Sequence, residues 1–339
     1  MSVDTQAPVP TADRLLIDGG TTTTRVWSVR GTRVLAEMRA TVGARDTARD
    51  GSPEALHRTV ADLLGQASAA AQECVPGWRA QDVVAAGMIT SPLGLAEVPH
   101  LPAPADLHAL AMGARVFSLA HVSSLPMLLL PGIRCGPTVP TVDGIADFDV
   151  MRGEEAVCLG LLEGGMLKDT GIALSLGSHW KLVEILDRRI TTCSTTMGGE
   201  LLHVLRTQTV LSASVDNELP AAFGTGDMDM LQRGLRASEV HGLPRAAFMT
   251  RLLERVPGSD SRGRLMFLLG VVMAATLQAW EDQLKGRQVL LLGARPICDA
   301  WHFALSAAGA EPRTVEPQEV TAAYVGALVR AADIVAEAR

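Results

Sequence analysis

Two short turns in this chain combine glycine with hydroxyl side chains between apolar runs. The first contains Gly20, Thr21 and Thr22, and the second contains Gly177 and Ser178. Glycine lets a ligand approach the backbone closely, while hydroxyl and backbone N–H groups donate hydrogen bonds to phosphate oxygens. Because the same strand–turn–strand pattern opens both halves of the chain, we expect two related halves that hold one nucleotide from opposite sides.

Charged side chains adjoin both turns. Asp18 ends the apolar run before the first turn, where an ordinary turn aspartate is one interpretation. The four threonines that follow and the second copy of the motif favour a functional role instead. Lys181 follows the second turn and either faces the phosphates or alternates outward along its strand. His179 is more typical of a structural histidine than of a catalyst.

A third group of residues places acids around the start of a predicted helix. Asp149 precedes it, and Glu154 and Glu155 follow Gly153. A reaction at a hydroxyl group needs a base to accept the proton, and the positive end of a helix favours ionised carboxylates. The same acids also fit a purely structural role, because first-turn acids stabilise any helix.

Length and composition limit the class of protein that carries these residues. The 339 residues suffice for two domains, and a net charge of −7 without a Lys/Arg run disfavours nucleic-acid binding. The five cysteines form no C-x-x-C pair, which argues against a zinc site or a disulfide framework and predicts a reduced, cytoplasmic protein. The longest uncharged stretch, 265–280, is shorter than the ~20 apolar residues of a membrane span, so we expect a buried helix and no membrane.

The elements that must position these residues alternate between strands and helices. In the first half we expect a strand–turn–strand at 14–38, a helix at 52–73, strands at 83–89 and 125–132, a proline-rich loop at 91–106 and a helix at 151–167. In the second half we expect a hairpin at 172–185, helices at 199–211, 228–256, 263–284, 297–308 and 318–337, and a strand at 288–293. This alternation predicts an α/β fold, and the two hairpins predict mixed sheets.

Several motifs give the chain a family resemblance. They are Asp18 to Trp27, Ala86 to Ser91, the run Met-Arg-Gly-Glu-Glu at 151–155, Gly177 to Lys181, and Met197 to Leu201. In order and spacing the chain resembles the 2-dehydro-3-deoxygalactonokinases, of the actin-like superfamily of sugar and acetate kinases. The resemblance covers roughly 14–330, and the run at 151–155 is its most specific part.

The resemblance implies a fold and a division into domains. The fold is a two-lobed, actin-like sugar kinase fold, a duplicated ribonuclease-H-like architecture with mixed sheets. We expect a flexible tail at 1–13, an N-terminal lobe at 14–165, a C-terminal lobe at 166–319 and a last helix at 320–339 that returns to the N-terminal lobe. Nucleotide would lie in the cleft between the lobes, whose closure excludes water.

The resemblance also assigns roles to the residues above. ATP and Mg²⁺ are the implied cofactors, with Asp18 as the metal ligand, most simply through water. Glu154 matches the catalytic base, with Glu155 and Asp149 in reserve. The phosphate contacts are Gly20, Thr21, Thr22, Gly177, Ser178 and Lys181, and the adenosine turn is Gly293 and Ala294.

The implied substrate is 2-dehydro-3-deoxy-D-galactonate, phosphorylated at its 6-position in galactonate catabolism. Its carboxylate needs a cation, ideally a planar fork, for which Arg152 is the first candidate and Arg25 the second. Each arginine fits a salt bridge to a neighbouring acid as well. Thr90 and Ser91 either donate hydrogen bonds to the substrate or cap the end of a strand.

Three departures from the family pattern keep alternatives open. Gly19 replaces a tryptophan, Gly198 a threonine and Leu95 an aromatic residue. The changes at Gly19 and Leu95 remove bulk near the expected sugar site, so a kinase for another sugar acid is one alternative. An actin-like ATPase that switches a protein partner and a non-catalytic sensor are the others, and a homodimer is left open.

Overall fold

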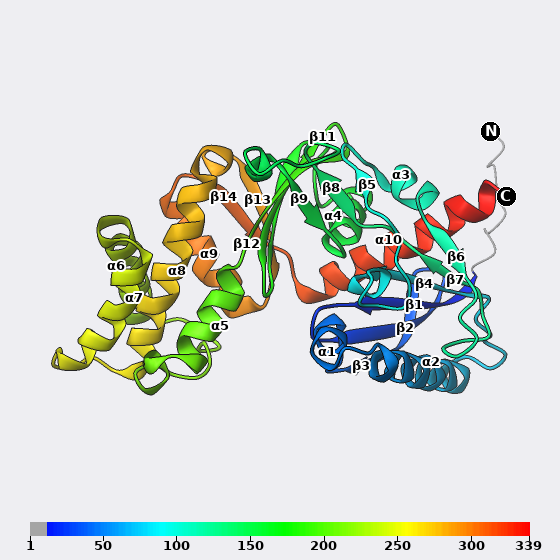
Figure 1. Ribbon diagram of the computed structural model, residues 1–339, viewed down its shortest axis with the longest axis horizontal. Coiled ribbons are helices and arrows are strands. Elements are labelled where there is room, and N and C mark those ends of the chain that lie inside the picture. Colours follow the sequence, from blue (N-terminus) through cyan, green and yellow to red (C-terminus); the bar gives the residue numbers. More distant parts are fainter. Residues whose placement is uncertain (1–11) are drawn as a thin grey trace, which may run out of the picture. The chain divides into compact units, whose positions relative to one another are not determined.

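The computed structural model describes residues 12–339 (Figure 1). Residues 1–11 of the expected tail lie outside the described residues, and Asp13 already opens a strand. The chain divides into two compact units. Unit 1 comprises the chain up to Met166, Arg188–Thr192 and Thr321–Arg339, and unit 2 comprises Leu167–Asp187 and Cys193–Val320. The domain boundaries expected from the sequence stay a prediction.

The main sheet of unit 1 has six strands in the order β3-β2-β1-β4-β7-β6. Their bounds are β1 Asp13–Gly19, β2 Thr24–Arg30, β3 Arg33–Ala40, β4 Asp82–Gly87, β6 Arg115–Phe117 and β7 Met127–Leu129. Strand β1 pairs antiparallel with β2 and parallel with β4, and β4 pairs parallel with β7. A smaller sheet joins β5 Leu101–Pro102, β8 Ile133–Cys135 and β9 Asp149–Met151.

The second large sheet, which belongs to unit 2 except for residues 189–192 of β12, repeats this arrangement in the order β12-β11-β10-β13-β14. Its strands are β10 Gly171–Leu176, β11 Trp180–Leu186, β12 Arg189–Thr196, β13 Gln288–Gly293 and β14 Glu311–Thr314. Strand β10 pairs antiparallel with β11 and parallel with β13, which pairs parallel with β14. Both sheets therefore carry an antiparallel meander followed by two parallel strands. The predicted α/β class with mixed sheets is confirmed.

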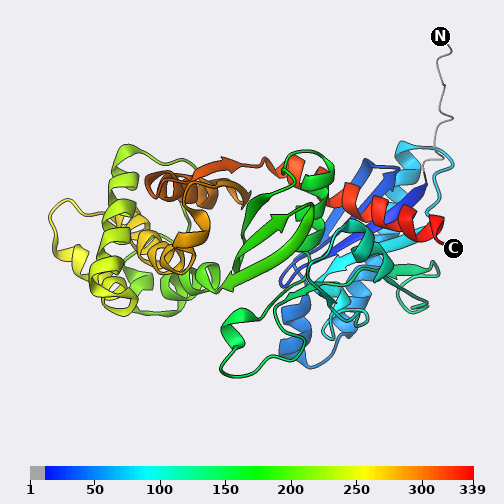
Figure 2. The ribbon, with the colours of Figure 1, turned by 90° about the horizontal axis from the view of Figure 1, so that it is seen from above.

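Helices cover the sheet of unit 1. They are α1 Ala44–Asp50, α2 Glu54–Cys74, α3 Leu107–Met112, α4 Glu154–Glu163 and α10 Pro317–Glu337, with short 3₁₀ turns at Met88–Thr90 and Ile145–Asp147. Helix α2 buries its apolar stripe against β2 and β3, while α10 lies along the strands of the same unit (Figure 2). Trp27 of β2 contacts Tyr324 of α10, with ring centroids 5.7 Å apart. Alternate residues of a strand point to opposite faces, so the sheet packs on both sides.

Unit 2 carries a group of helices around one buried helix. They are α5 Gly198–Gln208, α6 Thr225–His241, α7 Leu243–Leu252, α8 Ser261–Leu284 and α9 Arg295–Ala307, with 3₁₀ turns at Val210–Ala213 and Leu253–Arg255. Helix α8 has the length and composition of a membrane span, but 67% of its most apolar window is buried inside the protein. The predicted buried helix is confirmed. Trp280 of α8 packs against Trp301 of α9, which also packs against Trp180 of β11.

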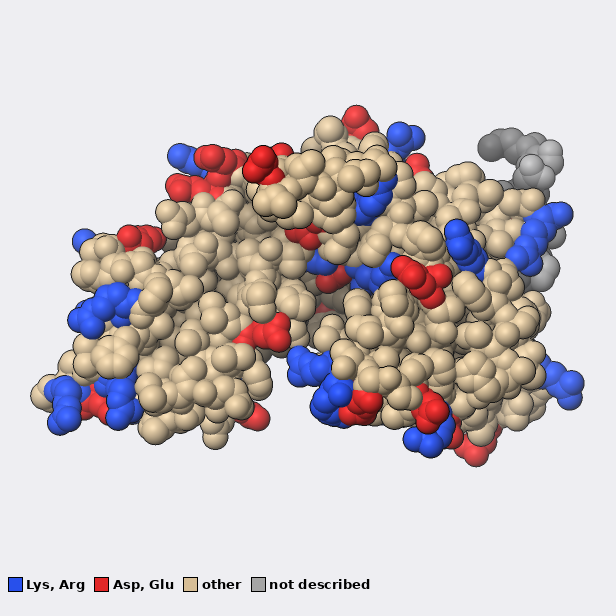
Figure 3. Space-filling view, in the orientation of Figure 1, with Lys and Arg blue, Asp and Glu red and all other residues tan. Residues whose placement is uncertain are grey.

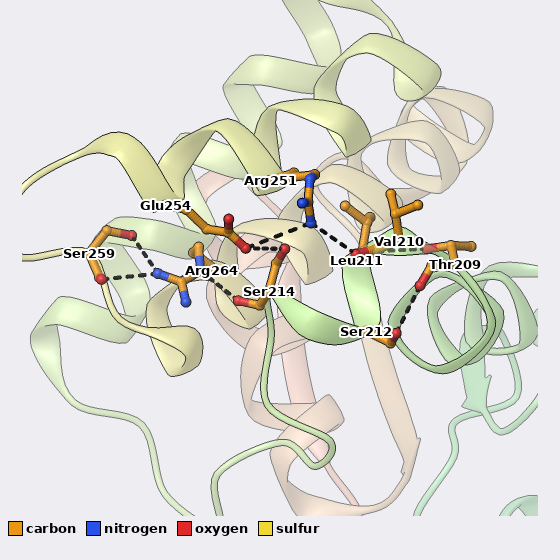
Figure 4. Close-up of polar contacts among 9 residues, drawn as sticks. All are labelled: Thr209, Val210, Leu211, Ser212, Ser214, Arg251, Glu254, Ser259 and Arg264. Atoms are coloured by element: carbon orange, nitrogen blue, oxygen red, sulfur yellow. Dashed lines mark hydrogen bonds and ion pairs between the residues drawn. The ribbon is translucent and has the colours of Figure 1, made fainter.

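A polar network ties the turn after α5 to the other helices of unit 2 (Figure 4). The hydroxyl of Ser214, which is fully buried, donates to Glu254 at 2.5 Å, and this hydrogen bond lowers the pKa of the Glu254 carboxyl. Arg264 donates from Nε to the carbonyl of Ser214 and from Nη1 to that of Ser259 at 3.0 Å. These bonds satisfy buried polar groups at a point where no regular element does so.

Most predicted elements are present with shifted ends, and a few short ones are additional. The segment 14–38 holds most of three strands rather than two, and the loop 91–106 contains only β5. Helix α1 was not predicted, because its seven residues show no apolar period.

On the face drawn in Figure 3, acidic and basic side chains are interspersed.

Candidate active site

The first glycine turn is held in place through its carbonyl groups. Gly20 closes the turn by donating from its N–H to the carbonyl of Thr23 at 2.8 Å. At the start of α1, the N–H of Arg45 donates to the carbonyl of Thr21 at 2.9 Å. A Cβ on Gly43 would lie 2.6 Å from the carbonyl oxygens of Gly20 and Thr21, so only glycine permits this approach. The unpredicted helix α1 thus fixes the orientation of the turn.

The second turn is held in the same way. The N–H of Glu200, in the first turn of α5, donates to the carbonyl of Ser178 at 2.7 Å. A Cβ on Gly199 would collide with the carbonyl oxygen of Gly177. His179 lies with Nε2 3.2 Å from the carboxylate of Glu200, which fits the structural role expected for this histidine. Each unit therefore presents one glycine turn braced from behind by a helix start.

The end of β13 lies beside the second turn. In the parallel pairing, Leu176 is opposite Gly293, and a Cβ on Gly293 would lie 3.1 Å from the carbonyl oxygen of Leu176. Ala294 then caps α9, with its carbonyl accepting from the N–H of Cys298 at 3.0 Å. The carboxyl ends of adjacent parallel strands are a common location for ligands. The expected adenosine turn is thus a neighbour of the expected phosphate turn within unit 2.

Lys181 does not point to solvent. It lies opposite Ser175 in the β10–β11 pair and is only 6% exposed. Of the two orientations left open by the sequence, the outward and solvated one is wrong. A buried ammonium group requires polar or anionic partners.

Asp18 ends β1 with its carboxylate partly buried. Its Oδ2 lies 3.2 Å from Nη2 of Arg25, the residue directly opposite on β2, and its side chain is 21% exposed. Burial raises the pKa of the Asp18 carboxyl, Arg25 acts in the opposite direction, and the negative charge of Glu154 raises it further. The structure therefore brings Asp18, Arg25 and Glu154 into one electrostatic cluster in unit 1.

Tyr324 is a site residue that the sequence analysis missed. Its hydroxyl is buried, donates to the carbonyl of Ile17 at 3.2 Å and also interacts with Asp18. Burial raises the pKa of this phenol well above its ordinary value, and the charges of Asp18 and Glu155 add to the effect. The signal in the sequence was slight, because Tyr324 lies in an alanine-rich helix far along the chain.

The three candidate bases have different surroundings. Glu155 is fully buried, and both of its oxygens accept from the N–H of Gly153, at 2.8 and 2.7 Å. Asp149 accepts from the N–H of Val150 at 2.7 Å. Glu154 is partly exposed, and its Oε2 lies 3.3 Å from the N–H of Arg152. The negative charge of Glu154 raises the pKa of the Asp18 carboxyl, and that of Glu155 raises the pKa of Tyr324. Which of the three acids is the base stays a prediction.

Arg152 binds Thr90, and Ser91 binds to other residues of the loop after β4. Nη1 of Arg152 donates to the carbonyl and to Oγ1 of Thr90, at 2.8 and 2.7 Å. Thr90 is fully buried, and the hydroxyl of Ser91 donates to the carbonyl of Met88 at 2.6 Å. Burial lowers the pKa of Arg152, while the charges of Glu155 and Glu97 act in the opposite direction. These bonds connect Arg152 to the loop after β4, and the substrate contacts expected for Arg152, Thr90 and Ser91 stay predictions.

The three positions that depart from the family pattern, Gly19, Leu95 and Gly198, pack against neighbouring side chains or belong to the core. A Cβ on Gly19 would lie 2.4 Å from that of Ile89, and Leu95 belongs to the core of unit 1 at 7% exposure. A Cβ on Gly198 would collide with the ring of Trp180. The small residues at Gly19 and Gly198 therefore accommodate neighbouring side chains, and the bulk missing from them opens no space there.

Two sheets of the same strand order, each with a glycine turn after its first strand, define the actin-like class of ATPases and sugar kinases. The profile of the 2-keto-3-deoxy-galactonokinase family matches residues 18–328. The chain belongs to this family and is a carbohydrate kinase.

Named relatives agree with this assignment. A probable 2-dehydro-3-deoxygalactonokinase of Rhizobium meliloti is 27% identical over 93% of this chain and 96% of its own. The 2-dehydro-3-deoxygalactonokinase of Escherichia coli is 26% identical over 83% of this chain and 85% of its own.

Solved structures show the same fold. A protein of Sinorhizobium meliloti assigned as a 2-dehydro-3-deoxygalactonokinase has a TM-score of 0.70 at 25% identity, over 94% of this chain and 99% of its own. An activator of 2-hydroxyisocaproyl-CoA dehydratase from Clostridium difficile has a TM-score of 0.52 at 11% identity, over 96% of both chains. The latter likeness concerns the fold alone.

Proposed function

We propose that this kinase transfers the γ-phosphoryl group of ATP to the 6-hydroxyl of 2-dehydro-3-deoxy-D-galactonate, in galactonate catabolism. The observation that carries the proposal is that Asp18 and the segment before Glu154 meet at the end of β4. A Cβ on Gly87 would lie 3.4 Å from Oδ1 of Asp18, and a Cβ on Gly153 would lie 3.4 Å from Cα of Gly87. Family membership supplies the substrate class. Phosphoryl transfer depends mainly on positioning and on neutralising charge.

Glu154 is the proposed catalytic base. It begins α4, where the helix dipole favours an ionised carboxylate that can accept the proton of the attacking hydroxyl. Gly153, with φ of +116°, gives the chain the turn that places Glu154 at this helix start. Glu155 supports the same turn through its bonds to the N–H of Gly153.

Asp18 is the proposed ligand of Mg²⁺. A partly buried carboxylate with a second acid nearby fits this ion, which prefers oxygen ligands and keeps several waters. When bound, Mg²⁺ would neutralise charge on the phosphates of ATP. Among the described residues no group of three or more acids, histidines or cysteines is placed to hold a metal alone, so phosphate oxygens would complete the ligand set.

The two glycine turns are the proposed phosphate contacts. Gly20, Thr21 and Thr22 serve in unit 1, and Gly177, Ser178 and Lys181 serve in unit 2. In both turns the carbonyl groups already accept from a helix start, which leaves the hydroxyl side chains and the opposite side of the turn for anions. Gly293 and Ala294 are the proposed adenosine contacts.

Arg25 is the proposed cation for the substrate carboxylate. Its side chain is 45% exposed, stands over the ring of Trp27 at 5.8 Å and lies beside Asp18. These contacts orient a planar fork that can bind an anion bidentately. The alternative of another sugar acid rested on Gly19 and Leu95, and both are buried. A cytoplasmic location and two lobes at 14–165 and 166–319 complete the proposal, and a homodimer stays a prediction.

The test is ADP release with Mg-ATP and one candidate acceptor at a time. The acceptors are 2-dehydro-3-deoxygalactonate, its gluconate epimer and several neutral sugars, with mass detection of each product. ADP release stoichiometric with a phosphorylated galactonate derivative supports the proposal. Faster turnover of another sugar acid would identify that compound as the substrate instead. ADP release that no sugar acid accelerates rejects the proposal.

A further inference from the structure

The guanidinium group of Arg152 gathers the loop that follows β4. Besides its two bonds to Thr90, it donates from Nη2 to the carbonyl of Val98 at 3.0 Å and lies 3.2 Å from Nδ1 of His100. A guanidinium group only donates, so Nδ1 of His100 is the acceptor and carries no proton. One side chain thus contacts three residues distributed along the segment 90–100.

Further hydrogen bonds connect residues of the same segment to one another and to α2. The N–H of Leu95 donates to the carbonyl of Ile89 at 2.7 Å, and that of Val98 donates to the carbonyl of Thr90 at 3.0 Å. Nε2 of His57, on α2, lies 3.2 Å from the carbonyl oxygen of Gly94. A loop fixed at so many points has few conformations left to lose when a ligand binds to it.

The backbone of Arg152 belongs to the segment that carries the proposed base. Its N–H contacts Glu154, and the next residue, Gly153, donates to Glu155. A Cβ on Gly153 would lie 3.4 Å from Cα of Gly87, at the end of β4. A movement of Arg152 would therefore displace both the loop and the carboxylate of Glu154.

We propose that Arg152 is a positioning residue that locks the segment 90–100 to the segment bearing Glu154, rather than a ligand of the substrate carboxylate. The inference rests on the proposed function for the role of Glu154. Lysine cannot take the place of Arg152, because the single ammonium group of lysine lacks the planar fork that reaches Thr90, Val98 and His100 together.

The experiment compares Arg152→Lys with the wild-type enzyme and with Arg134→Lys. Arg134 is a matched control, because it lies on the adjacent strand β8 and donates to the carbonyl of Pro137 at 3.2 Å in an exposed position. Hydrogen exchange of the amides of Leu95 and Val98 reports on the loop. Steady-state kinetics with varied sugar acid and varied Mg-ATP report on catalysis.

For Arg152→Lys we expect faster exchange at Leu95 and Val98 and a kcat lower by about 100-fold, the cost of a small misplacement of reacting groups. The KM of Arg152→Lys for Mg-ATP should stay at the wild-type value. Arg134→Lys should keep both the wild-type amide exchange and the wild-type kcat. Unchanged exchange and kcat, with only the KM for the sugar acid raised, would overturn the inference and return Arg152 to the substrate. A wild-type enzyme that phosphorylates no sugar acid rejects the proposed function, while the exchange data still judge the role of Arg152 in the loop.

If Arg152→Lys does not fold, His100 provides a second test. Asparagine at this position keeps an acceptor near the place of Nδ1, whereas alanine removes it. We expect His100→Ala to speed amide exchange at Val98 and to lower kcat. His100→Asn should keep both the exchange rate and kcat near their wild-type values. Equal behaviour of the two variants would overturn the inference.

Discussion

Tyr324, the single tyrosine of the chain, donates from its hydroxyl to the carbonyl of Ile17, which immediately precedes Asp18. The C-terminal helix α10 thereby reaches the strand end at which a carboxylate is held partly buried. The ring of Tyr324 also packs on Trp27. A residue near the end of the chain thus supports a group near its beginning.

Removing the hydroxyl should weaken this support. We expect Tyr324→Phe to lower the free energy of unfolding by about 1 kcal/mol, the usual net value of one hydrogen bond. We also expect it to raise the Mg²⁺ concentration needed for half-maximal activity, because Asp18 loses a partner. Urea unfolding and a Mg²⁺ titration measure the two effects. Ser68→Ala, which removes a hydroxyl bonded within α2 at 2.8 Å, should leave the Mg²⁺ titration unchanged.

The charge of Asp18 should cost stability while it serves activity. Because burial raises its pKa above the ordinary value of 3.8, the folded state holds the proton more tightly than the unfolded state. The free energy of unfolding therefore falls as the pH rises from 3.8 through the raised pKa, and the loss persists at neutral pH. Asp18→Asn should be more stable than wild type at pH 7 and lose this pH dependence. Its kcat should fall by more than about 100-fold. Lower stability of Asp18→Asn at pH 7 would contradict the prediction.

The two neighbouring glutamates should separate catalysis from stability. Glu154→Gln should lower kcat by about 100- to 10,000-fold, the range for a general base, and leave thermal unfolding near wild type. Glu155→Gln should instead lower the free energy of unfolding by about 1–3 kcal/mol, because a buried bond to Gly153 is weakened. Kinetics and calorimetry on both variants test this. Near-normal turnover in Glu154→Gln would refute the choice of base.

Arg14 should anchor α10 to the sheet of unit 1. Its side chain is 7% exposed and lies 2.8 Å from Asp333 of α10 and 3.3 Å from Asp82 of β4. Arg14→Met should lower the free energy of unfolding by about 3–5 kcal/mol, since two acids lose their partner. The exposed ion pair between Arg49 and Asp50 offers a control. Arg49→Met should lower the free energy of unfolding by no more than about 1 kcal/mol. Urea unfolding distinguishes them, and equal costs would show that Arg14 is no anchor.

Local patterns in the sequence were enough for most of the fold. The apolar strand, the glycine turn and the helical period are properties of short segments, so both hairpins, α2 and α8 could be predicted. Helix α1 could not, because its seven residues, five of them polar, show no apolar period, and the start of the helix binds a carbonyl group of a turn. The sequence also identified Asp18 and Glu154, since each follows directly from a strand end or a helix start.

Only the tertiary structure decided what these side chains contact. Arg152 and Thr90 are 62 residues apart, and Tyr324 and Ile17 are 307 apart, yet each pair shares a hydrogen bond. From the sequence, an arginine beside two glutamates fits a substrate ligand as well as a salt bridge to a neighbouring acid. The sequence by itself determined the fold class, the two turns and the candidate acids, because strand, turn and helix preferences act over a few residues. The partners of Arg152, Lys181 and Tyr324 depend on chain segments that meet only when the sheets and helices have packed.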